Sequence, residues 1–362
     1  MHGALHFRLM SFAGGRFSRF CRPVSIAFLL TERCNARCVH CDIWKSKGRE
    51  DTPGLEGWKQ VLLDLRRWLG PVNIVFTGGE ALLYPHTLEI VRYATSLRFQ
   101  VEVLTHGYWP DQAKVKQLAL TNPWRITTSV DGVGETHSKI RGRDDFWERT
   151  SQTIDTLAQI RSEQSLAFQI RLKTVIMEHN LDDLGNVARY ATRDRTEVFY
   201  QPIEQNYNTA LDPRWYETSA NWPTDPARAI RKIQELVELK RAGLHIANSA
   251  SQFDAMIRYF QDPAGLSLVT RAHTAHMPKV PCWGLTMLQL QANGDVTVCA
   301  NRPPVGNVRT KPIREIWKQR SCAWEQGCCL NASAPATPLV ELSPTPPAGQ
   351  PLSAKATGES SH

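Results

Sequence analysis

Short apolar runs alternate with longer amphipathic segments from Val24 to about Gly243. The runs are rich in β-branched residues, as strands are, and the segments between them carry apolar residues at helical spacing. The predicted strands are Val24–Leu30, Val72–Thr77, Gln100–Thr105, Arg125–Val130, Ala167–Ile176 and Glu197–Pro202. The predicted helices include Trp58–Leu69, Pro85–Leu97, Thr150–Ile160, Leu181–Tyr190 and Pro226–Lys240. Six strand-then-helix units predict an α/β fold with a parallel sheet, built as an open, partial (β/α)6 TIM barrel rather than a closed eight-unit one.

The alternation stops after about residue 245. Ala292-Asn293-Gly294-Asp295 then separates two short apolar runs, Leu288–Leu290 and Val296–Val298, which predicts a β-hairpin. The last stretch, 331–362, is rich in Pro, Ala and Ser without aromatic residues, and we expect it to be disordered. The predicted organisation is an N-terminal extension (1–22), a barrel (23–245), a small cysteine-bearing domain (246–330) and a tail (331–362).

Composition narrows the class of protein. At 42% hydrophobic residues the chain of 362 residues can bury a core. Its apolar runs are far shorter than the roughly 20 residues of a membrane-spanning helix, and it begins without a secretory signal pattern, so we predict a cytoplasmic protein with no membrane partner. The formal charge is +8, but no run of five Lys or Arg occurs, so nucleic acid is not the partner we expect.

The cysteines are the informative part of the composition. Nine are present, and no cysteine occurs between residues 42 and 281. One group near the start is Cys34, Cys38 and Cys41, and a second near the end is Cys282, Cys299, Cys322, Cys328 and Cys329. Clusters of this kind in an intracellular protein indicate metal or redox chemistry at two separate sites. Cys21 stands alone and is most simply a buried or idle thiol.

The first group places three thiolates on one short loop directly after the first predicted strand. Iron-sulfur clusters are held by such thiolates, usually four for a four-iron cluster. Three leave one iron without a protein ligand, and an open coordination position is where a substrate or cofactor can bind. The alternative is a structural zinc loop with His40 as the fourth ligand.

Polar motifs follow the next strands, at the edge where the active sites of such barrels lie. Thr77-Gly78-Gly79-Glu80 ends the second strand and Thr105-His106-Gly107 ends the third. Thr128-Ser129-Val130-Asp131-Gly132 ends the fourth, and Arg141-Gly142 comes ten residues after it. Arg141 suits a carboxylate by bidentate pairing or is a solvated surface arginine. His106 is either an acid or base or a hydrogen-bonded loop histidine.

Cys34-x3-Cys38-x2-Cys41 after the first strand, with the Gly-Gly-Glu motif after the second, resembles the radical S-adenosylmethionine (radical SAM) superfamily. The resemblance implies that S-adenosylmethionine (AdoMet) chelates the open iron and is cleaved by one electron to methionine and a 5'-deoxyadenosyl radical. It also implies which residues bind the cofactor: Gly78, Gly79 and Glu80 at the methionyl ammonium, and Thr105, Ser129, Asp131 and Arg141 elsewhere on AdoMet.

Cys282-x11-Gly294-x4-Cys299, followed by a short helix at Ile313–Trp317, resembles the SPASM and twitch domains that many radical SAM enzymes append. Five cysteines are fewer than the seven that two extra clusters need, so the resemblance implies one auxiliary 4Fe-4S cluster. Its expected ligands are Cys282, Cys299, Cys322 and Cys328, with Cys329 as the alternative to Cys328. A zinc site, or no metal at all, is the other interpretation.

The resemblance implies an enzyme whose radical abstracts hydrogen from an unactivated carbon, with a flavodoxin- or ferredoxin-like electron donor. We predict oxidative modification or crosslinking of a peptide or protein. Only 23 residues precede the first strand, so we expect either a separate partner that delivers the peptide or a small substrate. The alternative is a dehydrogenase or epimerase of a sugar or nucleoside. A non-catalytic iron-sulfur electron carrier or redox sensor is the alternative of another class, but it would not need Gly78-Gly79-Glu80.

Overall fold

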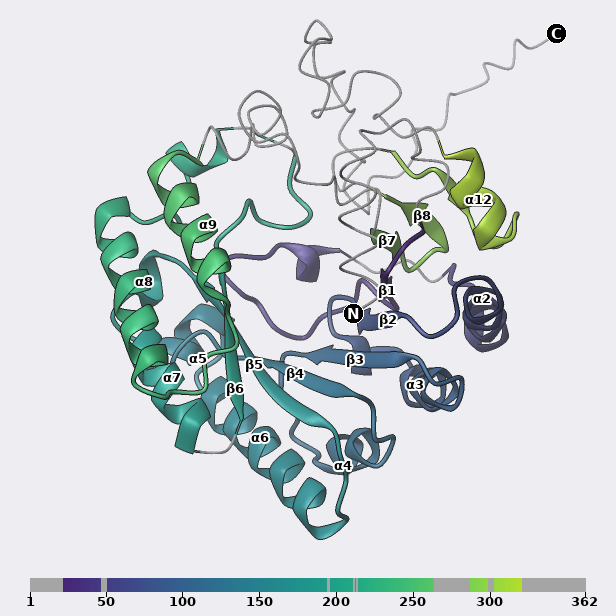
Figure 1. Ribbon diagram of the computed structural model, residues 1–362, viewed down its shortest axis with the longest axis horizontal. Coiled ribbons are helices and arrows are strands. Elements are labelled where there is room, and N and C mark those ends of the chain that lie inside the picture. The colour runs from purple at the N-terminus through teal and green to yellow at the C-terminus, as the bar shows by residue number, and fades with distance from the viewer. Residues whose placement is uncertain are drawn as a thin grey trace, which may run out of the picture.

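The computed structural model describes residues 22–46, 51–193, 196–210, 212, 214–263, 287–298 and 303–320. Six parallel strands follow one another along the chain and curve into an open barrel wall (Figure 1). They are β1 (Ser25–Leu29), β2 (Asn73–Thr77), β3 (Gln100–Thr105), β4 (Arg125–Ser129), β5 (Gln169–Ile176) and β6 (Glu197–Pro202). All six predicted strands and the partial-barrel fold are confirmed, with ends that shift by at most two residues.

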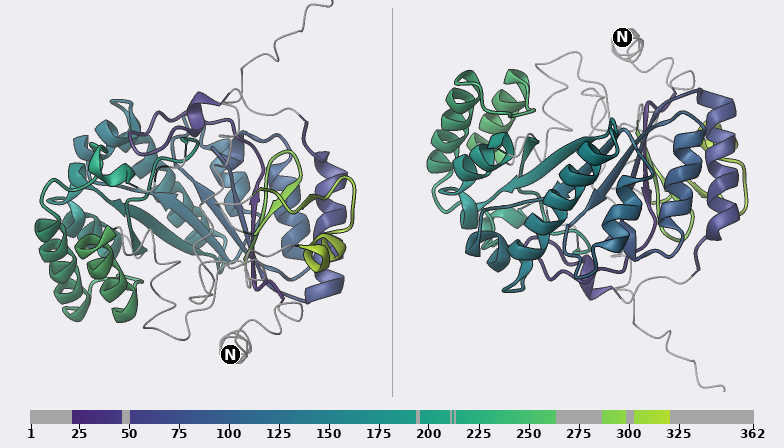
Figure 2. Two further views of the ribbon diagram at one scale, coloured as in Figure 1. Left: turned by 90° about the horizontal axis from the view of Figure 1, so that it is seen from above. Right: turned by 90° about the horizontal axis from the view of Figure 1, so that it is seen from below.

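Helices cover the outer face of the wall (Figure 2). They are α2 (Gly54–Leu69), α3 (Thr87–Ser96), α4 (Ala113–Ala119), α5 (Glu135–Arg141), α6 (Phe146–Glu163), α7 (Leu184–Arg193), α8 (Pro226–Arg241) and α9 (Ala250–Gln261). The strand period of two sends Ile26, Phe28, Ile74 and Phe76 outward, where they are fully buried in the core beneath the helices. The opposite face of each strand is left to line the barrel interior.

Local sequence signals explain where several helices begin. Pro226 is the first residue of α8, and the Asp225 carboxylate accepts the backbone N–H of Ala227 at 2.9 Å. Ser249 and Gln252 form a capping box at the start of α9. This helix, which the sequence pattern did not predict, packs on α8 and buries Phe253, Met256 and Phe260 in the barrel's second hydrophobic cluster.

The predicted hairpin is present as β7 (Met287–Leu290) and β8 (Asp295–Thr297), which pair antiparallel. Its placement was not predicted: β7 pairs parallel with β1, with Met287 opposite Ser25 and Leu290 opposite Phe28. Together with β9 (Gly306–Asn307) it gives one nine-stranded sheet in the order β6-β5-β4-β3-β2-β1-β7-β8-β9. The hairpin therefore extends the barrel wall beyond its first strand.

The helix predicted at Ile313–Trp317 is α12 (Ile313–Gln319), and it packs against α2. Trp317 and Trp68 meet with ring centroids 6.2 Å apart. Ile313, Ile316 and Trp317 are buried in the same hydrophobic cluster as the first four strands. The domain boundaries at 245 and 330 stay predictions. Among the described residues no helix is long and apolar enough to cross a bilayer, and the cytoplasmic location also stays a prediction.

Candidate active site

The loop after β1 brings the three N-terminal cysteines together. Cys38 is buried against Ala36 and Phe146, and Cys34 and Cys41 pack on the same small cluster. Three contacts from other elements fix the loop backbone. The N–H of Arg37 donates to the Arg141 carbonyl at 3.1 Å, that of Val39 to the Ile140 carbonyl at 3.0 Å, and Arg143 Nε donates to the Asn35 carbonyl at 3.0 Å.

Gly142, directly after α5, is required by this docking. Its φ of 76° lies in the left-handed region, and a Cβ there would stand 2.5 Å from the Arg37 carbonyl oxygen. The end of α5 and the cysteine loop therefore fit each other only because residue 142 has no side chain.

Burial outweighs the charges around the three thiols, although the Arg141 guanidinium favours the ionised form of Cys38. Burial raises the pKa of Cys34 to about 12 and of Cys41 to about 11, and it also raises the pKa of Cys38. Thiolates at this loop need a bound cation, and ligation to iron supplies one. The thiols are gathered on one loop with a shared apolar cover, and they stay the predicted ligands of a cluster.

His40 is the fourth ligand in the alternative of a single zinc ion. In the part of the chain that the structure describes, no group of three or more His, Cys, Asp or Glu side chains is arranged to hold one metal ion. His40 Nδ1 is buried without a hydrogen-bond partner, and burial lowers the pKa of the ring to about 4. A buried, neutral imidazole with a free nitrogen is also what a metal ligand requires, so the choice between a cluster and a zinc ion bound by His40 stays a prediction.

The Gly-Gly-Glu motif packs closely against the start of the cysteine loop. A Cβ on Gly78 would lie 2.4 Å from the Thr31 carbonyl oxygen, and one on Gly79 would lie 2.4 Å from that of Arg33. The N–H groups of Gly79 and Glu80 donate to the same two carbonyls, each at 2.8 Å. The two glycines therefore allow a close approach between this loop and the segment that leads into Cys34.

The Glu80 side chain is buried, with 1% exposed, and its carboxylate accepts two backbone N–H groups. Leu82 donates at 3.0 Å and His106 at 2.7 Å. Burial still raises the pKa of Glu80 to about 7, because desolvation outweighs these hydrogen bonds. Glu80 thus connects the loops that follow β2 and β3 through hydrogen bonds, beside the predicted AdoMet site.

His106 is a hydrogen-bonded loop histidine. Its Nδ1 accepts the N–H of Tyr108 at 2.9 Å, so the ring proton lies on Nε2, which is 2.6 Å from Asn35 Oδ1. Burial lowers the pKa of His106 to about 3. The ring is therefore neutral at physiological pH and contacts the cysteine loop through Asn35, and an acid or base role for it stays a prediction. Thr105 accepts the N–H groups of Gly107 and the Trp109 indole through its hydroxyl.

Asp131 and Arg141 form a buried ion pair. Arg141 Nη2 lies 2.6 Å from Asp131 Oδ2, and Arg141 Nη1 lies 3.5 Å from Cys38 Sγ. Arg141 is only 6% exposed, so the solvated-surface interpretation is wrong. Ser129 ends β4 opposite Lys173 of β5. The structure thus brings the predicted residues of strands one to four to one edge of the sheet, around the cysteine loop.

Comparisons with known proteins agree with this geometry. The family model of the radical SAM superfamily matches residues 28–191, and that of the SPASM iron-sulfur cluster-binding domain matches residues 282–333. The chain belongs to the radical SAM superfamily. It is an enzyme with a C-terminal SPASM domain, and this class binds AdoMet and 4Fe-4S clusters. The ligands of those groups in this chain stay predictions.

Three curated relatives illustrate the range of similarity. The AdoMet-dependent heme synthase of Methanosarcina barkeri is 26% identical over 302 residues, 82% of this chain and 82% of the relative. The sporulation killing factor maturation protein SkfB of Bacillus subtilis is 29% identical, over 49% of this chain but only 42% of its own length. A PqqA peptide cyclase of Xanthomonas oryzae is 22% identical over 85% of this chain and 79% of the relative.

Among solved structures, Streptococcus suis SuiB bound to its precursor peptide SuiA superposes with a TM-score of 0.62. The match covers 87% of this chain and 72% of that one, at 12% sequence identity. At this identity the likeness shows the fold alone.

The second cysteine group lies outside the described residues. This holds for Cys282, Cys299, Cys322, Cys328 and Cys329, and also for Cys21. The match to the SPASM family covers the five of them that follow residue 281. Which of these thiolates bind a cluster stays a prediction.

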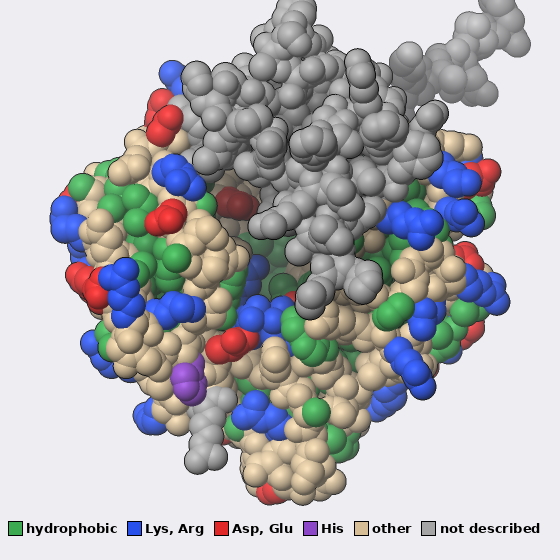
Figure 3. All heavy atoms as spheres, in the orientation of Figure 1, with side chains coloured by type: hydrophobic (Ala, Val, Ile, Leu, Met, Phe, Trp, Pro, Cys, Tyr) green, Lys and Arg blue, Asp and Glu red, His purple; other side chains and the backbone are tan. Residues whose placement is uncertain are grey.

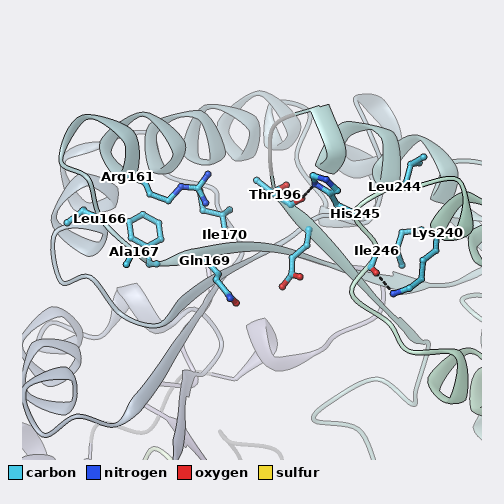
Figure 4. A pocket seen from close by; sticks show the side chains of 13 residues that line it. Arg161, Leu166, Ala167, Gln169, Ile170, Thr196, Lys240, Leu244, His245 and Ile246 are labelled. Atoms are coloured by element: carbon cyan, nitrogen blue, oxygen red, sulfur yellow. Dashed lines mark hydrogen bonds between the residues drawn. The ribbon is translucent and has the colours of Figure 1, made fainter.

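A groove of about 760 Å³ opens at the other end of the strands, where β5 and β6 begin (Figure 4). It is lined by Arg161, Gln169, Ile170, Lys240 and His245, among others, and by none of the predicted site residues. Lys240 Nζ is already held by the Ile246 carbonyl at 2.6 Å and the Asn248 carbonyl at 2.7 Å. The groove is therefore separate from the chemistry described above.

Proposed function

We propose that this chain cleaves AdoMet at a 4Fe-4S cluster held by Cys34, Cys38 and Cys41, and that it oxidatively modifies or crosslinks a peptide or protein substrate. Bound at the open iron and reduced by one electron, AdoMet supplies a 5'-deoxyadenosyl radical able to take hydrogen from an unactivated carbon. The observation that carries the proposal is the buried three-thiol loop, docked on the Gly-Gly-Glu segment at the end of a parallel barrel.

The protein's own part is to position groups and to exclude water. The close contact of Gly78 and Gly79 with Thr31 and Arg33 sets where the cysteine loop begins relative to β2. We propose that this loop, with Glu80 beneath it, receives the methionyl ammonium. An added cation there would favour the ionised form of the buried Glu80 carboxyl. Thr105, Ser129, Asp131 and Arg141 are the further proposed AdoMet contacts.

The inner face of the barrel offers charges to a substrate. Lys173 lies on the inner face of β5, because its neighbours Leu172 and Thr174 are buried beneath the helices. Glu204 follows β6, and burial lowers the pKa of Lys173 and raises that of Glu204. Neither side chain makes a hydrogen bond or ion pair with another described residue. Figure 3 shows a hollow near the centre of this side of the molecule, with basic and acidic side chains at its edge. Such a surface suits a substrate with polar or charged side chains.

Relatives support the peptide class. The names of the matched PqqA peptide cyclase and of SuiB bound to precursor peptide SuiA state a peptide as the molecule that those proteins act on or bind. The cyclase match covers 85% of this chain and 79% of the relative, so it extends beyond the barrel. We extend the peptide class to this chain on that basis.

A tetrapyrrole is the second candidate substrate, within the small-molecule alternative. It is favoured by one observation: the heme synthase match covers 82% of both chains at higher identity than the peptide cyclase. Charged groups inside the barrel suit a molecule with carboxylate side chains equally well. The two substrate classes are therefore separated by experiment rather than by the shape of the site.

The test uses full-length protein reconstituted without oxygen, with AdoMet and either dithionite or a flavodoxin- or ferredoxin-like donor. One arm receives a library of synthetic peptides and the other Fe-coproporphyrin III, and products are read by mass spectrometry. We expect 5'-deoxyadenosine in company with peptides that lose two hydrogen atoms. A changed porphyrin with unchanged peptides would move the function to the second candidate. Absence of 5'-deoxyadenosine in every arm would contradict the proposed cleavage of AdoMet.

A further inference from the structure

Arg141 connects a cysteine of the N-terminal site to a buried carboxylate. One end of its guanidinium, Nη1, lies 3.5 Å from Cys38 Sγ, and the other, Nη2, lies 2.6 Å from Asp131 Oδ2. Cys38, Asp131 and Arg141 are all buried. A cation is thus placed against a predicted cluster ligand, with its counter-charge on the far side.

Asp131 is held in place from several directions. Its other carboxylate oxygen accepts the N–H of Val175 at 2.9 Å, its own N–H donates to His137 Nδ1 at 3.1 Å, and its carbonyl accepts Asn180 Nδ2 at 2.8 Å. The backbone of Arg141 is fixed as well, because its carbonyl accepts the N–H of Arg37. The guanidinium therefore has little freedom to turn away from the sulfur.

The rest of the environment of Cys38 is apolar. Ala36 and Phe146 cover it and are themselves buried. Of the other basic side chains in this region, Arg37 and Arg143 are exposed, and Lys173 is partly buried on β5. In a low-dielectric setting a buried charge acts more strongly than an exposed one, which water and salt screen. Arg141 is consequently the basic side chain with the strongest field at this sulfur among the described residues.

We propose that Arg141 tunes the reduction potential of the N-terminal cluster. The proposal rests on the proposed function, because it takes Cys38 as a ligand of that cluster. Hydrogen bonds to cluster sulfurs and nearby charge are among the factors that set such potentials. Reduction adds a negative charge, so the guanidinium stabilises the reduced cluster and raises its potential, while Asp131 offsets part of this effect. Arg141 then eases the one-electron reduction that precedes AdoMet cleavage.

Substitutions of Arg141 and of Asp131 should shift the reduction potential of the cluster in opposite directions. Arg141→Gln removes the cation and should lower the potential, whereas Asp131→Asn leaves the cation without its counter-charge and should raise it. At a fixed solution potential near the midpoint we expect about a tenfold change in the ratio of reduced to oxidised cluster for each variant, which corresponds to about 59 mV for one electron. The double variant, which has neither charge, should lie between the two.

The measurement is a redox titration of the anaerobic holoenzyme followed by electron paramagnetic resonance (EPR). The N-terminal cluster is identified as the signal that changes when AdoMet is added, and the titration itself is run without AdoMet. Arg37→Gln is the matched control, since it removes an exposed arginine from the same loop and should leave the potential unchanged. Iron content is measured for every variant.

The possible outcomes test the tuning role of Arg141 separately from the proposed function. Opposite shifts with retained iron support the tuning role. Equal or same-direction shifts overturn it, and so do unchanged potentials in both single variants. If Arg141→Gln keeps the wild-type potential but weakens AdoMet binding, the tuning role is overturned and Arg141 acts only as an AdoMet contact. If the wild-type protein has no AdoMet-sensitive signal, the proposed function itself fails.

Discussion

Gly79→Ala is the substitution whose effect follows most directly from the geometry. The new Cβ would stand 2.4 Å from the Arg33 carbonyl oxygen and 2.8 Å from that of Glu32, and both are backbone atoms that no side-chain rotation can move. Overpacking of this kind costs about 1–3 kcal/mol. The hydrogen bonds from Gly79 to Thr31 and from Glu80 to Arg33, each 2.8 Å long, would also be broken or stretched at about 1 kcal/mol apiece. We therefore expect a loss of about 3–5 kcal/mol, concentrated in the segment that leads into Cys34.

Two readouts locate this loss. Denaturant unfolding of the apo protein measures the change in free energy of unfolding, and iron content after reconstitution measures whether Cys34 still reaches its cluster. Gly185→Ala, in helix α7, is the matched control: its Cβ would meet only the flexible end of Arg189 and the Leu239 methyl, so we expect a gain of about 0.5–1 kcal/mol. A Gly79→Ala protein with wild-type stability and full iron would refute the close-packing argument.

Three further predictions concern the thiols and the buried histidine. Cys38→Ala should abolish 5'-deoxyadenosine formation from AdoMet, and retained cleavage would contradict the ligand assignment. Cys282→Ala should lower iron to about four per chain, one 4Fe-4S cluster, and unchanged iron would mean that no auxiliary cluster depends on this residue. Burial lowers the pKa of His106 to about 3, so as the pH falls the imidazole is protonated in the unfolded chain before it is protonated in the folded one. His106 therefore makes the free energy of unfolding fall as the pH drops from about 6.5 toward 3, at up to about 1.4 kcal/mol per pH unit. His106→Asn should flatten the measured curve of unfolding free energy against pH in that range, and an unchanged slope would show that the ring is not buried and neutral.

Strand and motif positions were predictable because they depend on local sequence. The β-branched runs located all six barrel strands, and the Asn-Gly turn located the hairpin of β7 and β8. The sequence pattern did not predict helices α4, α5 and α9. Helices α4 and α5 have only seven residues each, too few for a clear helical period of apolar residues. Helix α9 lies beyond the region where strands and helices alternate. The parallel pairing of β7 with β1 joins residues more than 250 positions apart, and no turn or spacing specifies it.

In the candidate site, too, the sequence predicted the local motifs but not the contacts between them. The sequence located the chemistry of Cys34, Glu80, Asp131 and Arg141 at the strand ends, but it did not say which polar groups satisfy one another. The structure shows Arg141 paired with Asp131 and directed at Cys38, and Glu80 accepting backbone N–H groups from two loops. Such pairings depend on the relative placement of neighbouring strand ends in the folded barrel, which a linear pattern does not encode.

The central claim is that AdoMet binds directly to an iron left open by the three-thiol loop. The most direct measurement is the EPR spectrum of the reduced, anaerobic protein with and without AdoMet, on the wild type and on Cys38→Ala. The account predicts that AdoMet alters the signal of one cluster in the wild type and that this response disappears in the variant. A wild-type spectrum indifferent to AdoMet, or a variant that responds as the wild type does, would contradict it.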